Sequence, residues 1–341
     1  MRRVNHYLLK NFLSLFGSLF FILFFITSVV FFIKIATLTS IIKINFLELG
    51  EMYLYLLPRI FLYTLPITFF IAVCVSMYNL SKENETIVLF TLGYPPSKIA
   101  KFFISLASFL CLLLIFDFFV LVPLSKQLNQ NFIDYKKVEA KFNIKATEFG
   151  QNFSDWLVYI NHIDENGSYN DVVMYQQKTT KDEQKLVTAK SAQVDNSSGL
   201  LQLKLDDGKI FEIGSQKIDQ TNFEKMLINS LSQNFITEVL SIKEYWKEAW
   251  NNEKRSADFS FFLLIALFPL ASIHFALSIS IVTYRYEKRS IYLQMFLFIA
   301  AYIASIIVLV NILFFYTVFV VFFGAFIISW LFYRKKIFAR Y

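Results

Sequence analysis

The sequence has few charged residues and few of the residues that interrupt or cross-link a chain. Only 17% of its 341 residues are charged, whereas a soluble domain carries about a quarter. It holds 9 Gly and 6 Pro, which argues against collagen-like or low-complexity sequence. The two cysteines, Cys74 and Cys111, fall within apolar runs. The composition therefore argues against a soluble enzyme, a disordered chain and a disulfide-stapled secreted scaffold.

Sequence signatures of catalysis are also missing. The chain contains no G-x-x-x-x-G-K-[ST] phosphate loop and no G-x-S-x-G nucleophile motif. Its three histidines, His6, His162 and His274, are far apart along the chain and share no acidic partner. We therefore expect no catalytic residue, no metal site and no cofactor on this chain.

What the sequence does have is long apolar runs. Hydrophobic residues make up 56% and aromatic residues 18%, and the mean hydropathy is +0.50. A bilayer core needs about 20 apolar residues of helix. The run 291–330 is uncharged over 40 residues and predicts two spans with a turn near Asn311. Six membrane spans are expected in all, and the other four are residues 12–33, 60–80, 102–122 and 259–284.

The net charge of +7 is confined to the apolar parts of the chain. Residues 126–255 hold 17 Lys and Arg against 19 Asp and Glu, so the excess flanks the spans. A nucleic-acid binder would place it on a soluble face instead. Thirteen Lys and Arg lie in the short segments on the side of the termini, against three between the first two spans. The positive-inside rule therefore places both termini in the cytoplasm.

Two titratable residues fall inside the predicted spans. Asp117 lies six residues before Pro123, so we expect it to be hydrated near the outer surface. His274 lies in the middle of its span, where a hydrogen bond to a neighbouring helix is the simplest expectation. A proton-coupled carrier usually has several such groups.

Residues 126–257 form a polar insert on the outer side, between residues 1–125 and 258–341. Segments 156–160, 171–175 and 201–205 are typical of strands. Asp207-Gly208 predicts a hairpin turn before a strand at 210–213, and Asn166-Gly167 predicts another turn. Helices are expected at 127–141 and 237–251. The predicted fold is thus an α-helical membrane protein of six spans with an inserted all-β domain.

A short cytoplasmic helix is predicted between the second and third spans, over residues 82–93. Ser81 can cap it, and Gly93 followed by two prolines is a typical end. The helix would have about three turns. Its acidic residues are Glu83 and Glu85, and its apolar residues include Ile87, Val88, Leu89 and Leu92. It would be either an ordinary connector at the membrane surface or a docking element for a partner.

This segment resembles the LptF/LptG (YjgP/YjgQ) permeases of the lipopolysaccharide export transporter. The matching positions are Leu80, the polar residues 82–84, Glu85, the apolar residues 87–90, and Leu92-Gly93. The resemblance covers essentially the whole chain. Other matching positions are Pro58 and Pro66, Thr188-Ala189-Lys190, Asp207-Gly208, Arg255, Arg289 and Tyr302. The chain departs from the family near Asn311, where it has neither the Gly nor the Pro that family members often carry.

The resemblance implies a β-jellyroll insert in the periplasm, a place in the bacterial inner membrane, and several partners. These are a second LptF/LptG-type permease, an LptB-type ATPase dimer that uses the ATP, and LptC-type and LptA-type proteins. Lipopolysaccharide would be extracted from the inner membrane and passed through the β domain. Glu83, Glu85, Ile87, Leu89, Leu92 and Gly93 would form the helix that couples to the ATPase, with Glu85 as the leading residue.

The same resemblance suggests residues that contact the lipid. Lys34, Lys43 and Arg59 lie near the outer surface, where they could bind phosphates. They could equally anchor spans at the interface, and for Lys43 we prefer that reading. Trp156 and Leu203, with Val158, Leu201 and Leu205, are candidates to line the β domain.

Other functions stay open on the sequence alone. An ABC permease for another lipid or a lipoprotein fits the same spans. A membrane receptor with an outer β sensing domain is disfavoured, because the longest cytoplasmic piece is about 20 residues, too short to fold alone. The sequence does not separate the LptF type from the LptG type, although the first two spans lean toward LptF.

Overall fold

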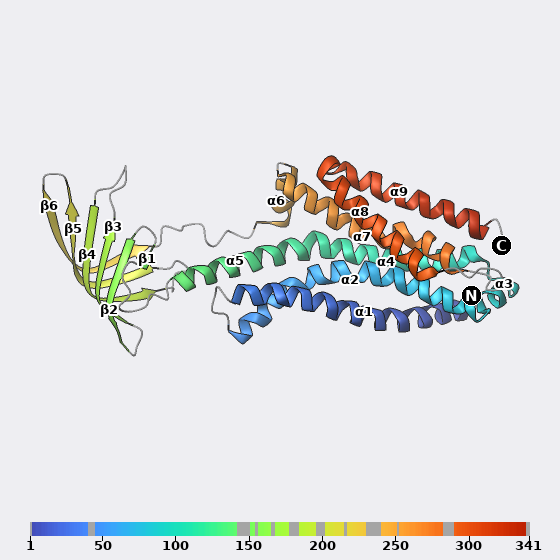
Figure 1. Cartoon of the computed structure of the whole chain (residues 1–341), viewed down its shortest axis with the longest axis horizontal. Helices are drawn as coiled ribbons and strands as arrows, with labels where there is room; N and C mark the ends of the chain where they lie inside the picture. Colours follow the sequence, from blue (N-terminus) through green and yellow to red (C-terminus); the bar gives the residue numbers. More distant parts are fainter. Residues whose placement is uncertain are drawn as a thin grey trace. The chain divides into compact units, whose positions relative to one another are not determined.

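The computed structural model describes eleven segments of the chain: residues 2–39, 45–141, 151–153, 156–164, 168–176, 184–195, 202–214, 217–229, 240–250, 252–281 and 290–338. They fall into two compact units (Figure 1). The helical unit comprises Met1–Leu38, Asn45–Asn129 and Val239–Tyr341. The β unit comprises Thr39–Ile44 and Gln130–Glu238, so it is narrower than the predicted insert of 126–257.

Among the described residues, six helices are long and apolar enough to cross a bilayer, which confirms the six predicted spans. The turn between the last two falls at Phe314 and Phe315, close to the predicted Asn311. The six spans are α1 (Arg2–Thr39), α2 (Phe46–Lys82), α4 (Pro96–Phe116) continued through the π-helix η1 (Asp117–Leu121) into α5 (Val122–Lys141), α7 (Glu253–Ser280), α8 (Ile291–Leu313) and α9 (Tyr316–Tyr333), which the π-helix η3 (Arg334–Phe338) extends.

Helix α7 is the centre of this unit. In its most apolar stretch 78% of the residues are buried, against 17% for α1 and α8 and 22% for α9. Small residues let helix backbones approach closely in lipid. Those buried on α7 are Ser256, Ser260, Ala266, Ala271, Ser272, Ala276, Ser278 and Ser280. Helix α1 instead joins the bundle through aromatic rings, such as Phe12 against Phe69 at 5.4 Å between centroids.

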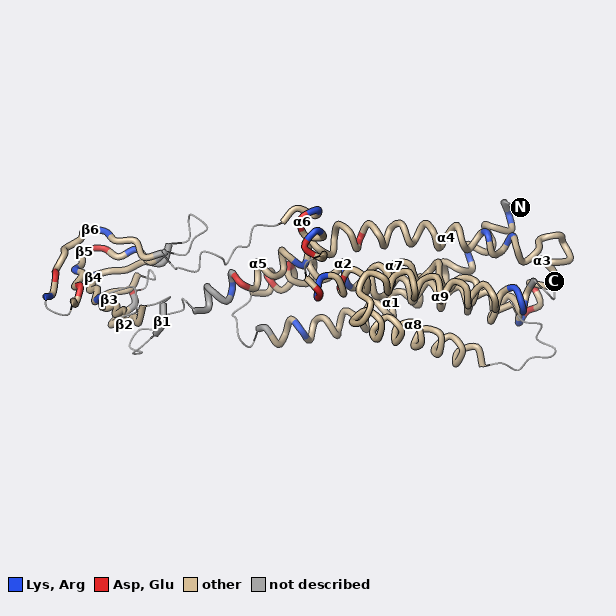
Figure 2. The backbone as a smooth tube through the Cα atoms, turned by 90° about the horizontal axis from the view of Figure 1, so that it is seen from above, with Lys and Arg blue, Asp and Glu red and all other residues tan. Residues whose placement is uncertain are grey.

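Charged residues gather at the two ends of the helical unit (Figure 2). One end holds both termini and the short helix α3 (Glu85–Thr91), and the other holds α6 (Ile242–Lys247) (Figure 1). Asp117 is the exception, and its predicted hydrated position is wrong. It is only 8% exposed and begins the π-helix η1. The sequence could not show that η1 packs against α2 and α7.

The described strands of the β unit form one antiparallel sheet in which each strand pairs with its sequence neighbour. The predicted all-β insert is confirmed. Its strands are β1 (Gln151–Phe153), β2 (Trp156–Ile163), β3 (Tyr169–Gln176), β4 (Gln184–Asp195), β5 (Gln202–Ile213) and β6 (Ile218–Asn229). The Asp207-Gly208 hairpin is wrong, because β5 continues through both residues. The Asn166-Gly167 turn lies outside the described residues.

A line of residues that are left out of the strand-to-strand register crosses five strands of this sheet. Asn161, Asp171, Lys190, Asp207 and Glu224 lie opposite one another in succession, yet each is left out of the pairing between neighbours. Two of them, Asp171 and Asp207, have φ of +54° and +52°. Lys190 Nζ donates to Asp207 Oδ2 at 2.5 Å, and this hydrogen bond raises the pKa of Lys190.

The apolar alternation shifts by one residue across that line. On β4 the buried positions change from Val187 and Ala189 to Ala192. On β5 they change from Leu203 and Leu205 to the partly buried Ile210. One extra residue in each strand therefore keeps the same face apolar on both sides of the break. Within β5 the Asp207-Gly208 pair forms this break in the pairing and does not form a hairpin turn.

We predict that Gly208→Ala destabilises the β unit. An added Cβ would lie 2.2 Å from the Thr188 carbonyl oxygen and 2.4 Å from the Phe223 ring. Because the backbone oxygen cannot yield, we expect a loss of roughly 1–3 kcal/mol. Pulse proteolysis of the full chain, read from cleavage within the insert, measures it. Gly324→Ala is the control, since a Cβ there meets nothing within 4 Å. Equal cleavage of both variants would contradict the close approach.

Candidate functional site

Helix α3 begins later than the sequence predicts. Helix α2 runs on through Lys82, so Ser81 lies inside it and is 2% exposed. The predicted cap at Ser81 is therefore wrong. The chain instead breaks at Asn84, whose φ of +61° is one that Asn tolerates better than most residues. Helix α3 has seven residues, and Glu85 is the first of them.

The end of α3 is where the sequence predicts it. Gly93 has φ of +75°. Its N–H donates to the Phe90 carbonyl at 3.0 Å, and the N–H of Tyr94 donates to the Leu89 carbonyl at 3.0 Å. This pair of bonds is a Schellman motif, which needs a residue in the left-handed region and so favours glycine. Gly93 thus sets the length of α3.

Helix α3 has one face on the bundle and one face free of it. Thr86 and Leu89 are buried at 2% and 9% exposure. Ile87, Val88 and Leu92 are 37%, 54% and 75% exposed. An apolar surface of about one and a half turns therefore stands at the end of the helical unit that holds the termini.

Two hydrogen bonds tie the α3 segment to α1. The Tyr7 hydroxyl donates to Glu85 Oε2 at 2.5 Å, and the Tyr94 hydroxyl donates to Asn5 Oδ1 at 2.5 Å. Burial raises the pKa of Tyr94, which keeps its proton on the donating oxygen. Glu83 is exposed at the end of α2. Sequence reasoning missed Tyr7 and Asn5, because nothing local links residues 78 and 89 positions apart.

An apolar pocket of about 230 Å³ lies between α2, α7 and α8. Tyr63, Pro66, Phe268, Tyr302 and Ile306 are among the residues that line it. The Tyr302 hydroxyl donates to the Leu264 carbonyl at 2.8 Å, so its polar atom is engaged within the protein. The pocket therefore suits a hydrocarbon group.

Two of the predicted cations are linked to this pocket through Tyr63, one of the residues that line it. Tyr63 stacks on Phe31 of α1 at 6.4 Å between centroids. Lys34 follows Phe31 and holds its Nζ 5.2 Å from that ring, and Arg59 precedes Tyr63 by about one turn. Helices α1 and α2 run in opposite directions (Figure 1). Because Lys34 follows Phe31 and Arg59 precedes Tyr63 in sequence, both cations come after the Phe31–Tyr63 contact in the same direction along the bundle. Lys43 lies outside the described residues.

The predicted apolar residues of the insert share one face of the sheet. Trp156 is 8% exposed and Leu203 1% exposed, and Val158 and Leu205 belong to the same buried cluster. Leu201 lies outside the described residues. This face is apolar enough to hold acyl chains, and it is equally what any half-buried sheet needs.

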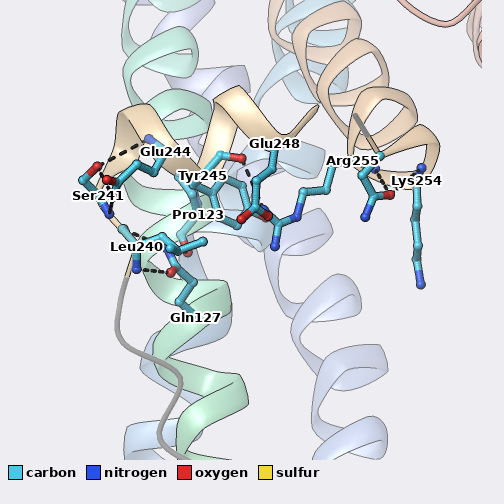
Figure 3. A network of polar contacts seen from close by, with 10 residues as sticks. Pro123, Gln127, Leu240, Ser241, Glu244, Tyr245, Glu248, Lys254 and Arg255 are labelled. Carbon is cyan, nitrogen blue, oxygen red and sulfur yellow. Dashed lines mark hydrogen bonds and ion pairs between the residues drawn. The ribbon is translucent and has the colours of Figure 1, made fainter. Parts of the chain in front are cut away.

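Polar contacts fix the chain where it returns to the helical unit after the insert (Figure 3). The side chain of Gln127 accepts from the Leu240 N–H at 2.7 Å and donates to the Leu240 carbonyl at 3.5 Å. Ser241 and Glu244 then form a capping box at the start of α6. The two bonds from Ser241 lower the pKa of Glu244.

A protein-family match identifies the family of the chain that carries these sites. A family model described as lipopolysaccharide export system permease LptF/LptG matches residues 6–335. The chain belongs to the LptF/LptG family. No curated protein matches the sequence. As an LptF/LptG protein, the chain is a multi-pass membrane permease, and members of this family are transport proteins rather than catalysts.

Arg255, a position that resembles the family pattern, joins α6 to α7 in this LptF/LptG protein. Its guanidinium lies 4.7 Å from the centroid of the Tyr245 ring and donates to the Tyr245 carbonyl at 3.4 Å. It also pairs with Glu248 (Figure 3). A planar guanidinium can stack and form directed bonds at once, whereas an ammonium cannot.

We predict that Arg255→Lys lowers the unfolding midpoint of the purified protein in detergent. The stacking and the fork of hydrogen bonds would be lost, at a cost of about 1 kcal/mol. Lys254→Ala is the matched control, because the Lys254 side chain extends away from the network (Figure 3). Equal midpoints for Arg255→Lys and the unchanged protein would show that charge alone holds this joint.

Proposed function

We propose that this chain is one of two permease subunits of an ABC transporter that moves lipopolysaccharide out of the bacterial inner membrane. A separate ATPase dimer would supply the energy, since the sequence has no phosphate loop. The lipid would pass to the β unit and then to LptC-type and LptA-type bridge proteins. The family match supports the transporter class.

The main support for lipopolysaccharide as the substrate is the combination of an apolar pocket with two cations. Lipopolysaccharide combines acyl chains with anionic phosphates. The pocket between α2, α7 and α8 suits an acyl chain. Lys34 and Arg59, around the neighbouring Phe31–Tyr63 contact, suit a phosphate through charge-assisted hydrogen bonds. The distribution of Lys and Arg favours an orientation with this side of the bundle toward the periplasm.

Helix α3 supports the proposed coupling to the ATPase at the opposite, cytoplasmic end. Its exposed Ile87, Val88 and Leu92 suit a hydrophobic groove. Glu85 fixes α3 to α1 through Tyr7. A carboxylate has about four acceptor positions, so Glu85 can also bind an Arg or Lys of the ATPase. Movement of the ATPase would then reach α1 directly.

We predict that Glu85→Ala uncouples transport from ATP hydrolysis while the permease stays in the membrane. Removing one member of a desolvated charge pair costs about 2–5 kcal/mol, and 1.4 kcal/mol is about a factor of ten. ATP-dependent release of lipopolysaccharide from membrane vesicles should therefore fall about tenfold or more. Tyr7→Phe should give a smaller loss, since it removes only the bond within the chain.

Of the two acidic residues expected in the coupling segment, the proposal assigns the ATPase contact to Glu85 alone, because Glu83 is the exposed C-cap of α2 and lies outside α3. Glu83→Ala is therefore the control for that series. It should release lipopolysaccharide at the normal rate. Normal release by Glu85→Ala, with normal recovery of the complex, would remove Glu85 from the coupling site.

We predict that Lys34→Gln combined with Arg59→Gln reduces the lipopolysaccharide that copurifies with the transporter. Each lost charge-assisted bond is worth about 1.5–3 kcal/mol, so the amount per permease should fall about tenfold or more. Mass spectrometry of the purified complex measures it. Lys254→Gln is the matched control. Unchanged lipid in the double variant would favour the interfacial-anchor role, and recovery of a different lipid or a lipoprotein would keep the transporter and replace its substrate.

A further inference from the structure

Three buried polar atoms of α7 and α9 have no hydrogen-bond partner among the described residues. They are Nδ1 of His274, Oγ of Ser329 and the hydroxyl oxygen of Tyr333. The described part of the chain has seven such side-chain atoms, so nearly half belong to this one pair of helices. Leaving a buried polar group unpaired costs about 1–3 kcal/mol. Three at one interface therefore call for a ligand.

Helix geometry brings the three residues together. Phe326, Ser329 and Tyr333 are spaced by three and four along α9, so they share one face. The ring of His274 lies edge-on to both aromatic rings, at 5.4 Å between centroids in each case. Ser329 lies between those two rings on the same face and is fully buried. It therefore lies on the face of α9 that carries both contacts to His274.

The Ser329 hydroxyl differs from those of Ser272 and Ser280, and it shares the lack of a partner among the described residues with Ser76 and Ser256. Ser272 donates to the Phe268 carbonyl at 2.8 Å, and Ser280 donates to the Ala276 carbonyl at 2.7 Å. The hydroxyl of a serine in a membrane helix commonly donates to a backbone carbonyl of the preceding turn in this way. Ser329 makes no such bond among the described residues, so its hydroxyl is available to a ligand.

We propose that His274, Ser329 and Tyr333 bind one internal water molecule between α7 and α9. A buried water needs two to four polar partners, and an imidazole nitrogen and two hydroxyls supply three. The three groups include no carboxylate, and the described residues hold no cluster of metal ligands. A neutral ligand that both donates and accepts therefore fits better than a cation.

The site is close to the end of the bundle that holds the termini. His274 is six residues before the end of α7, about 9 Å along the helix. Tyr333 is the last residue of α9, where the π-helix η3 begins. The proposed site is thus within about two helical turns of that end of the bundle.

Radiolytic hydroxyl-radical labelling of the full chain, purified from membranes with its associated proteins, tests the proposal. A bound water next to a tyrosine yields a radical that oxidises the ring, even where bulk solvent does not reach. Tyr302 is the matched control, because it is equally buried at 5% exposure, against 7% for Tyr333, and its hydroxyl already binds Leu264. We expect severalfold more oxidation at Tyr333 than at Tyr302. Equal oxidation of the two, whether high or low, would overturn the proposal.

A second comparison uses Ser329→Ala together with His274→Phe. Removing two of three partners should release the water, so oxidation of Tyr333 should fall to the level of Tyr302. Unchanged oxidation in a variant that is recovered normally would also overturn the proposal. The wild-type comparison decides the proposal even where this variant does not fold.

Discussion

The bilayer offers no hydrogen-bond partner to the backbone, and the helical unit depends on this constraint. Each span is a helix, and interruptions occur where a side chain meets the freed groups. At the π-helix η1 the Trp246 indole N–H donates to the Phe119 carbonyl at 3.0 Å. At the turn between α8 and α9 the Ser260 hydroxyl donates to the Phe314 carbonyl at 3.0 Å. Irregular backbone is therefore held by the chain itself.

The same constraint separates the tasks of the two ends. The middle of the bundle is apolar and packs around the small residues of α7, so charged groups gather at the ends. One end presents α3, fixed to α1 through Glu85 and Tyr7. The other holds Lys34, Arg59 and the joint at Arg255. Rigid helices connect these ends, so a movement of α3 can be transmitted along α1 to the cations that would hold the lipid.

Much of the fold follows from local patterns in the sequence, and the exceptions have a common cause. The six spans could be predicted from the length of the uncharged apolar runs, and the all-β insert from its polar composition and its short strand-like segments. The Asp207-Gly208 pair predicts a hairpin, because positive φ is typical of tight turns. In the structure Asp207 has positive φ inside strand β5, at a break in the pairing that depends on the neighbouring strands. The burial of Asp117 and the bond from Tyr7 to Glu85 depend on contacts between distant segments. Gly93 was predictable because a Schellman motif is local.

Affinity purification of the tagged chain from membranes in mild detergent, with mass spectrometry of the proteins and lipids that accompany it, tests the proposed export function most directly. A permease of the lipopolysaccharide exporter should bring a small cytoplasmic ATPase, a second six-span permease and lipopolysaccharide into the same preparation. A folded preparation that contains neither an ATPase nor lipopolysaccharide would contradict it, because the permease would then have no energy source and no cargo.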